Sequence, residues 1–195
     1  MRGTATTPTA APHSAPIRAR TIGAAAVSTE SCVANEEQLR ADLYAAFRNR
    51  ALLYHHMFDA LRREMGEARA VEVMGRAIYA RGTEIGKSFA RYAPGDLAGL
   101  RDAFVGFVPD EGRMFAPQVT RCDAGGLDIK LQRCPQKDAW REAGLADAEV
   151  ARLCQIAGRI DNGTFEAAGF EFSADTWQPG REGCCYLHIR PGPHR

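Results

Sequence analysis

The period of the apolar residues changes once along this chain, and that change constrains the fold more than any other feature. From Asn35 to about Phe107 the apolar residues recur every three or four positions, the spacing of amphipathic helices. In "QVTRCDAGGLDIKLQRC", residues 118 to 134, they alternate around "DAGG", a plausible hairpin turn. The first part therefore predicts helices, and the part that follows opens with a pair of strands.

The predicted elements follow from these periods and from the residues that end them. One helix should run from Asn35 to about Met65, a second should end before Pro94, and a third should begin after Asp96 as its N-cap. After the hairpin, Cys134-Pro135 should open a short helix, and another should span about 147–160. Strands are predicted in "GFEFSADTW" and "CCYLHIR". The order ααα-ββ-αα-ββ predicts an α+β fold with helices packed on one face of a roughly four-stranded antiparallel sheet.

The length of 195 residues suits one domain, predicted at residues 34–192 after a flexible tail at residues 1–33. The formal net charge is +1, and no basic patch is present, so nucleic acid is not an expected partner. No apolar run approaches the ~20 residues that span a bilayer, and no signal-peptide core is present. We therefore expect a cytoplasmic location without a membrane partner, and reduced thiols at all six cysteines.

Cys134 is the first candidate for chemistry. As the residue before Pro135 it would cap a helix, where free backbone N–H groups and the helix dipole lower the pKa of a thiol from its usual ~8.5. A lowered pKa at that position would favour the thiolate, which is the form needed in a nucleophile or a metal ligand. A small side chain that caps the helix and packs inward accounts for the same residue, since free cysteine is among the most buried residue types.

Two more cysteines open the last predicted strand, where neighbouring side chains point to opposite faces. Cys185 shares a face with Leu187 and Ile189, so it is predicted to point into the core, as a functional thiol or an apolar filler. The outer face should carry Cys184, Tyr186 and His188. His188 is a candidate base, although an exposed strand histidine usually has no catalytic role.

Asp161 follows the largely apolar "CQIAGRI" at the predicted end of a helix, where a carboxylate is unfavourable against the dipole. It is therefore either solvated in a turn or held there for a purpose, and Glu166 nearby could pair with it. Trp177 is predicted to be core or a pocket wall. The candidates for substrate contact are Glu166, Trp177 and Tyr186.

Three stretches can be matched together: "RCPQKDAWREAGL", "LCQIAGRIDNGTFEAAGFEF" and "GREGCCYLHIR". They resemble the L-2-amino-thiazoline-4-carboxylic acid hydrolase family in three features. These are a Cys-Pro before a short amphipathic helix, an "ID" followed by an aromatic residue, and a terminal strand opened by Gly and Cys. The resemblance covers about residues 38–190, and its specific part is 134–189. It implies site residues at Cys134, Asp161 and Cys185.

The resemblance also implies an activity, because the family's namesake adds water to a 2-aminothiazoline ring and gives N-carbamoyl-cysteine. The expected function is a hydrolase that opens a small cyclic amidine at a C–N or C–S bond. In one scheme the thiolate of Cys134 or Cys185 attacks the amidine carbon while Asp161 or His188 transfers protons. In the other, the same groups hold a divalent metal that activates water. No other cofactor is expected.

Two further classes of function fit the predicted order of elements. One is a small-molecule sensor domain that resembles the vinyl-reductase-like domains and binds without turnover. The other is a structural or interaction protein, which predicts no polar cluster in a cavity. A small-molecule substrate is the expected partner, and the glycines of the second predicted helix would permit a homo-oligomer.

Overall fold

The structure, a computed structural model, describes residues 29–193. The predicted tail therefore lies outside the described residues as far as residue 28. The elements are α1 (Thr29–Met65), α2 (Glu67–Gly86), a 3₁₀ turn η1 (Ala90–Tyr92), α3 (Leu97–Phe107), β1 (Pro117–Asp123), β2 (Gly126–Leu131), α4 (Pro135–Glu142), α5 (Asp147–Ala157), α6 (Arg159–Ala168), β3 (Glu171–Asp175) and β4 (Tyr186–Arg190). None of the described helices combines the length and apolarity needed to cross a membrane.

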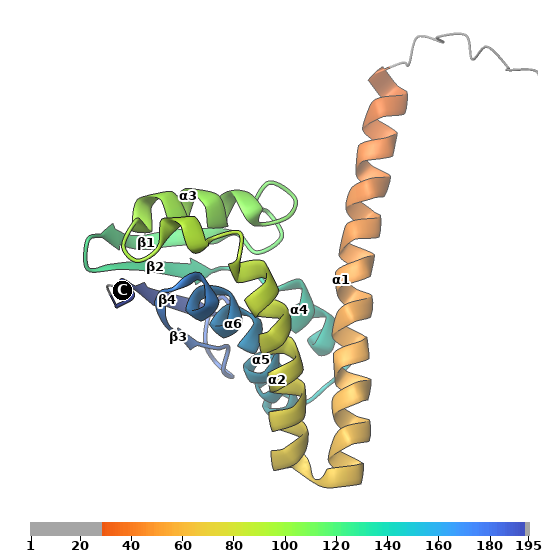
Figure 1. The fold of residues 1–195 in the computed structure, drawn as a ribbon. Helices are drawn as coiled ribbons and strands as arrows, with labels where there is room; N and C mark the ends of the chain where they lie inside the picture. Colours follow the sequence, from red (N-terminus) through yellow and green to blue (C-terminus); the bar gives the residue numbers. More distant parts are fainter. Residues whose placement is uncertain (1–28, 194–195) are drawn as a thin grey trace, which may run out of the picture.

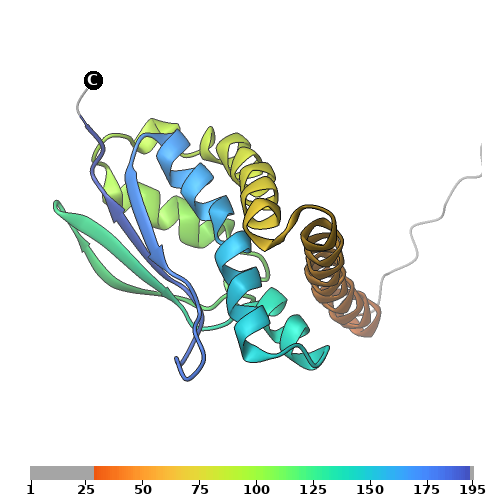
Figure 2. The same ribbon diagram turned by 90° about the horizontal axis from the view of Figure 1, so that it is seen from below.

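The four strands form one antiparallel sheet in the order β1-β2-β4-β3. The hairpin predicted around "DAGG" joins β1 to β2, and β4 lies between β2 and β3. Along β2 and β4, alternate apolar side chains are fully buried and form the inner face of the sheet; these are Leu127, Ile129, Leu187 and Ile189. Figure 2 shows that all helices lie on that one side of the sheet. The predicted α+β fold is confirmed.

The helices are stacked in layers away from the sheet (Figures 1 and 2). Helices α3, α5 and α6 lie next to the strands, and Phe104 and Phe165 from this layer meet with ring centroids 5.1 Å apart. Helix α2 crosses α6, and α1 lies outermost. Two side chains of α1, Ala51 and Phe58, are fully buried, so α1 is part of the core although it stands at the side of the domain.

The crossing of α2 over α6 depends on glycine. A Cβ on Gly82 would overlap the carbonyl of Ile160, and a Cβ on Gly163 would overlap the carbonyl of Tyr79. The two backbones are therefore in direct contact, which only residues without a side chain permit.

Two predicted element boundaries were wrong. The helix predicted for about 147–160 is two helices, and α6 continues to Ala168. The second group therefore contains three helices rather than two. Helix α1 begins at Thr29, before the expected Asn35. By contrast, Asp96 caps α3 as predicted, because its carboxylate accepts the backbone N–H of Gly99 at 2.9 Å.

Candidate active site

Cys134 occupies the predicted position at the start of α4. Its backbone is extended (φ −153°, ψ 110°), and Pro135 is the first residue of the helix. The fixed φ of proline favours a helix start, so this dipeptide ends the extended chain that leaves β2 and begins α4. Cys134 thus lies at the positive end of the helix, as the sequence predicted.

The segment with Cys184 and Cys185 is fastened to the end of β2. The N–H of Cys184 donates to the carbonyl of Leu131 at 2.9 Å, and the N–H of Leu131 donates to the carbonyl of Cys185 at 2.8 Å. The buried side chain of Lys137 adds a third link, because its Nζ donates to the carbonyl of Gly183 at 3.1 Å. Cys134 follows Leu131 by three residues. The end of β2 therefore positions both Cys134 and the segment with Cys184 and Cys185.

Four cysteines lie near one another at this point, and Cys184 is the one that the others influence most. Its sulfur is 3.5 Å from that of Cys185, and the thiols of Cys134 and Cys154, the latter from α5, are near enough to affect its pKa. None of these cysteines is in a disulfide. Three separate parts of the sequence therefore supply one thiol cluster, which we define as Cys134, Cys154, Cys184 and Cys185.

The prediction that Cys185 points into the core and Cys184 outward was wrong. Cys184 is 3% exposed and belongs to the core, whereas Cys185 is partly buried beside it. The strand β4 begins only at Tyr186. Ahead of it, two successive residues bond to the single residue Leu131, as in a β-bulge, so the alternation does not continue through the two cysteines.

The cluster separates the proton affinities of its thiols. The Cys184 thiol, followed by the backbone N–H groups of Lys137 and Gln136, holds the pKa of Cys134 below its ordinary value. These two N–H groups belong to the first turn of α4, where backbone donors favour the charged form of a thiol. The thiols of Cys134, Cys154 and Cys185 raise the pKa of Cys184. The two pKa values therefore shift in opposite directions, so of the two thiols Cys134 releases its proton more readily and Cys184 holds its proton more strongly.

Asp161 lies in the first turn of α6, not at the end of a helix as predicted. A carboxylate is favourable at that end of the dipole. Burial nevertheless raises its pKa to about 7, and burial is the sole cause. Asp161 shares a helix face with Phe165 and Ala168, which follow at spacings of four and seven and are both buried. A carboxyl with this pKa can both release and accept a proton near neutral pH.

Glu166 and Trp177, the other candidates from this part of the chain, do not act with the Asp161 carboxyl. Glu166 is exposed on α6, where it accepts hydrogen bonds from the Tyr79 hydroxyl and the Asn162 amide, both at 2.9 Å. It has no part in the pKa of Asp161, so the two carboxyls do not form an acid–base pair. Trp177 is 4% exposed, and the guanidinium of Arg141 lies 5.8 Å from its ring centre, so it is a core side chain.

His188 and Tyr186 lie on the open face of the sheet, away from the buried thiols. Nδ1 of His188 is 2.8 Å from the Asp128 carboxylate, which also accepts from Arg190 at 2.8 Å. Burial alone would raise the pKa of Asp128, but the hydrogen bonds from Arg190 and His188 lower it. The Tyr186 hydroxyl is 2.6 Å from that of Thr120. The structure therefore does not bring these two candidates together with Cys134.

The sequence interpretation missed Cys154 as a site residue. It reads as an ordinary apolar position of α5, and its spacing carries no signal of the thiols that it meets. Among the side chains that the structure describes, those of residues 35–193, no group of three or more His, Cys, Asp or Glu is placed to hold a metal ion. The observed geometry therefore gives the metal scheme no ligand set among the described residues.

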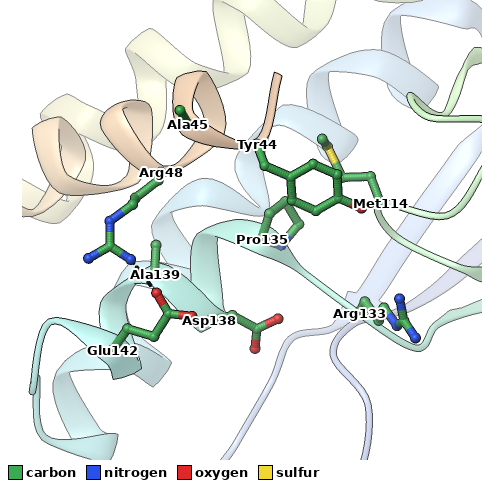
Figure 3. A pocket seen from close by; sticks show the side chains of 9 residues that line it. All are labelled: Tyr44, Ala45, Arg48, Met114, Arg133, Pro135, Asp138, Ala139 and Glu142. Carbon is green, nitrogen blue, oxygen red and sulfur yellow. Dashed lines mark hydrogen bonds and ion pairs between the residues drawn. The ribbon is translucent and has the colours of Figure 1, made fainter. Parts of the chain in front are cut away.

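Two surface pockets accompany this cluster. One, of about 500 Å³, lies between α1, α4 and the loop before β1 and is drawn in Figure 3. The other, of about 510 Å³, lies between α2 and the α5–α6 pair. None of the predicted catalytic residues lines either pocket, although Arg133 and Pro135, the neighbours of Cys134, line the first.

Comparison with known proteins identifies the family of the chain. No curated protein matches the chain. A family model described as L-2-amino-thiazoline-4-carboxylic acid hydrolase matches residues 46–189, which include most of α1, the whole sheet apart from its last residue, and every member of the thiol cluster. Because the match covers well over half of the chain, this protein belongs to the L-2-amino-thiazoline-4-carboxylic acid hydrolase family.

Proposed function

We propose that the protein is a hydrolase that opens a small cyclic amidine, of the 2-aminothiazoline-carboxylate type, with Cys134 as its nucleophile. The observation that carries the proposal is the convergence of Cys134 with Cys184 at the start of α4, where the pKa of Cys134 is lowered. A thiolate is the reactive form of cysteine, and a low pKa makes it available at neutral pH. The family match supports the substrate class.

In the proposed reaction the Cys134 thiolate attacks the amidine carbon between the ring sulfur and the ring nitrogen. The carbon–sulfur bond breaks, the ring sulfur leaves and takes up a proton, and the carbon stays bound to Cys134 as an isothiourea. Water then adds to that carbon, gives up a proton, and the Cys134 thiolate leaves. The sum is the addition of one water molecule, and the product is the N-carbamoyl amino acid with a free thiol.

Two residues support these steps in the proposal. Cys184 donates its S–H toward Cys134, which stabilises the thiolate before attack and as it leaves. We assign the proton transfers to Asp161, since its pKa of about 7 suits both directions. Asp161 lies on α6, and Cys154, a member of the thiol cluster, lies on α5, the helix directly before it. His188 is a weaker candidate because it lies on the open face of the sheet.

The test compares Cys134→Ser with Cys122→Ser, a free cysteine on β1 outside the cluster. With 2-amino-thiazoline-4-carboxylate as substrate and product measured by mass spectrometry, we expect Cys134→Ser to lose at least about 100-fold in turnover. Cys122→Ser should keep wild-type turnover, and a chelator should leave both proteins unchanged. A Cys134→Ser, Cys185→Ser double variant with full turnover would overturn the proposal.

A second experiment tests the role of Cys184 without a turnover assay. The rate at which iodoacetamide labels Cys134 should follow its ionisation, and peptide mass spectrometry reports that rate at each pH. Cys184→Ala removes the S–H donor, so the labelling profile of Cys134 should move to higher pH. Cys122→Ala is the control and should leave the profile in place. An unchanged profile in Cys184→Ala contradicts this role.

A further inference from the structure

The pocket in Figure 3 has an apolar base and charged ends. We call it the α1–α4 pocket; it is lined by Tyr44, Ala45, Arg48, Met114, Arg133, Pro135, Asp138, Ala139 and Glu142. Its uncharged surface comes from the Tyr44 ring, Pro135, Ala139 and the fully buried Met114. A volume of about 500 Å³ is within the range of small-molecule sites.

The four charged side chains of the pocket differ in how they are paired. Arg48 and Glu142 form an ion pair with each other across the gap between α1 and α4. The guanidinium of Arg133 makes no ion pair or hydrogen bond with any side chain in residues 35–193, and Arg133 is exposed. Asp138 has only a distant contact, 3.4 Å, with its neighbour Lys137 and is half exposed. One cation and one anion are therefore available to a ligand.

The loop that supplies Met114 to the base of the pocket contains three strained residues, none of which lines the pocket itself. Asp110, Glu111 and Ala116 have φ values of 56°, 53° and 44°, which residues other than glycine rarely adopt. Asp110 is held against α1 by Arg40 at 3.0 Å and by the hydroxyl of Tyr44, itself a pocket residue, at 3.3 Å. Backbone strain of this kind persists where the surrounding structure enforces it, and it is concentrated at ligand sites.

From this arrangement we infer that the α1–α4 pocket binds a small zwitterion that carries one carboxylate and one cationic nitrogen group. Arg133 would hold the carboxylate through its forked N–H groups, and Asp138 would accept from the cationic group. A flat or short aliphatic body would lie against Tyr44 and Pro135. Both α-amino acids and cyclic amidine acids have this chemistry.

The inference does not rest on the thiol chemistry. Cys134 lies between Arg133 and Pro135 in an extended backbone, and alternate side chains of an extended chain point to opposite sides. Arg133 and Pro135 line the pocket, whereas Cys134 does not line it and meets Cys184 instead. The α1–α4 pocket is thus a second site, on the other side of the segment that carries the nucleophile.

Isothermal titration tests the inference with four probes, on the full chain with Cys134→Ala so that the proposed substrate is not turned over during the measurement. Two are zwitterions, 2-amino-thiazoline-4-carboxylate and L-serine, and two have one charge, 2-aminothiazoline and propionate. At least one zwitterion should bind with clear preference over both single-charge probes. Binding of the ring compound alone would identify amidine acids as the ligand class, and binding of both zwitterions would identify a general amino-acid site.

Variants then place the binding in the pocket. Arg133→Gln and Asp138→Asn should each weaken it roughly 10- to 100-fold, the effect of losing a hydrogen bond to a charged group. Ala45→Trp should fill the pocket and abolish binding. Ala46→Trp, the exposed neighbour outside the lining, should leave binding intact. No binding of either zwitterion, equal binding of a single-charge probe, or normal binding by Ala45→Trp would overturn the inference.

Discussion

The carboxyl of Asp161 forms no ion pair within the described residues, and burial raises its pKa from 3.8 to about 7. Between these two pH values the unfolded chain releases the proton while the folded protein retains it. The contribution of Asp161 to stability is therefore complete below about pH 4 and is lost as the pH rises through 7. At about 1.4 kcal/mol per pH unit, the loss is at most about 4 kcal/mol.

Asp161→Asn should remove this pH dependence, because the amide does not ionise. We expect the variant to unfold at a higher temperature than the wild type at pH 8 and at a similar temperature at pH 4, measured by circular dichroism. Turnover should fall in the same variant if Asp161 transfers protons. A variant with wild-type turnover would remove Asp161 from the mechanism, and a variant no more stable at pH 8 would show that the carboxyl is solvated.

At this scale the sequence was informative about Cys134 and uninformative about its neighbours. A cysteine before a proline at the start of a helix is a local pattern, and it predicted the direction of the pKa shift, although the largest cause, the Cys184 thiol, lies outside that pattern. Cys154 and Cys184 join the cluster through tertiary packing. The orientation of Cys184 depends on the irregular pairing with Leu131, and strict alternation predicted the opposite face.

Among the elements, the segment before β4 depends on Gly183. Its φ is 80°, and a Cβ there would lie 3.1 Å from Cε of Lys130 and 3.3 Å from the carbonyl of Leu131. Gly180 in the same segment also has a φ of 80°, but a Cβ there would meet no atom within 4 Å. The two glycines therefore have the same backbone conformation and differ only in their surroundings, so Gly180 can serve as the control for substitution of Gly183.

We expect Gly180→Ala and Gly183→Ala each to lose about 1–2 kcal/mol of stability, because both residues leave the preferred backbone region. Only Gly183→Ala should also displace Cys184 from Cys134. Turnover and the labelling profile of Cys134 should therefore change in Gly183→Ala and stay normal in Gly180→Ala. Equal effects of the two variants on the thiols would contradict this account of the segment.

The contact between α2 and α6 gives a second matched pair. Gly82→Ala would place a methyl group on the carbonyl of Ile160, so the helices must separate, and we expect a loss of about 3 kcal/mol or more. Gly106 lies within α3 and has open space around it. Gly106→Ala should gain up to about 1 kcal/mol through helix propensity. Urea unfolding measures both, and a tolerated Gly82→Ala would show that the crossing is loose.

This contact also explains why α6 was missed in the sequence. The run Asp161-Asn162-Gly163 has the composition of a turn, and the sequence analysis placed Asp161 at the end of the preceding helix. In the structure Gly163 is needed for contact with α2 instead, and burial of Phe165 and Ala168 stabilises the helix. Local propensity is a weak signal, and tertiary packing overrides it here. The strands and the helices with a clear apolar period were predicted well.

For the molecule as a whole, the attachment of α1 depends in part on Asp110. The hydrogen bonds from Arg113 and Arg40 lower the pKa of this carboxyl to about 2. A lowered pKa stabilises the fold above the ordinary value of 3.8, and this contribution disappears as the pH falls toward 2. The loop before β1 should therefore separate from α1 in acid.

Asp110→Asn should lower the unfolding temperature at pH 7 and approach the wild type as the pH falls through 2, since the wild-type carboxyl then also loses its charge. Thermal unfolding over this pH range is the measurement. Asp102→Asn is a suitable control: its partner is the adjacent Arg101, so it links no distant elements. If both variants behave alike at pH 7, Asp110 does not connect the loop to α1.

The periodicity was sufficient to predict a sheet with helices on one face, because burial of one strand face requires a cover. The α1–α4 pocket could not be predicted in this way. Its walls come from the first helix, a loop and a helix some ninety residues later, and charged residues on exposed helix faces show no pattern that distinguishes a pocket from solvent.

The origin of the four sulfurs has a consequence for how the protein matures. They come from the end of β2, from α5 and from the residues ahead of the last strand, so a chain that has not yet joined β4 to β2 holds Cys134 without Cys184. Such an intermediate lacks the donor that makes Cys134 reactive. Labelling of Cys134 at neutral pH during refolding would thus report the moment at which the final strand is inserted.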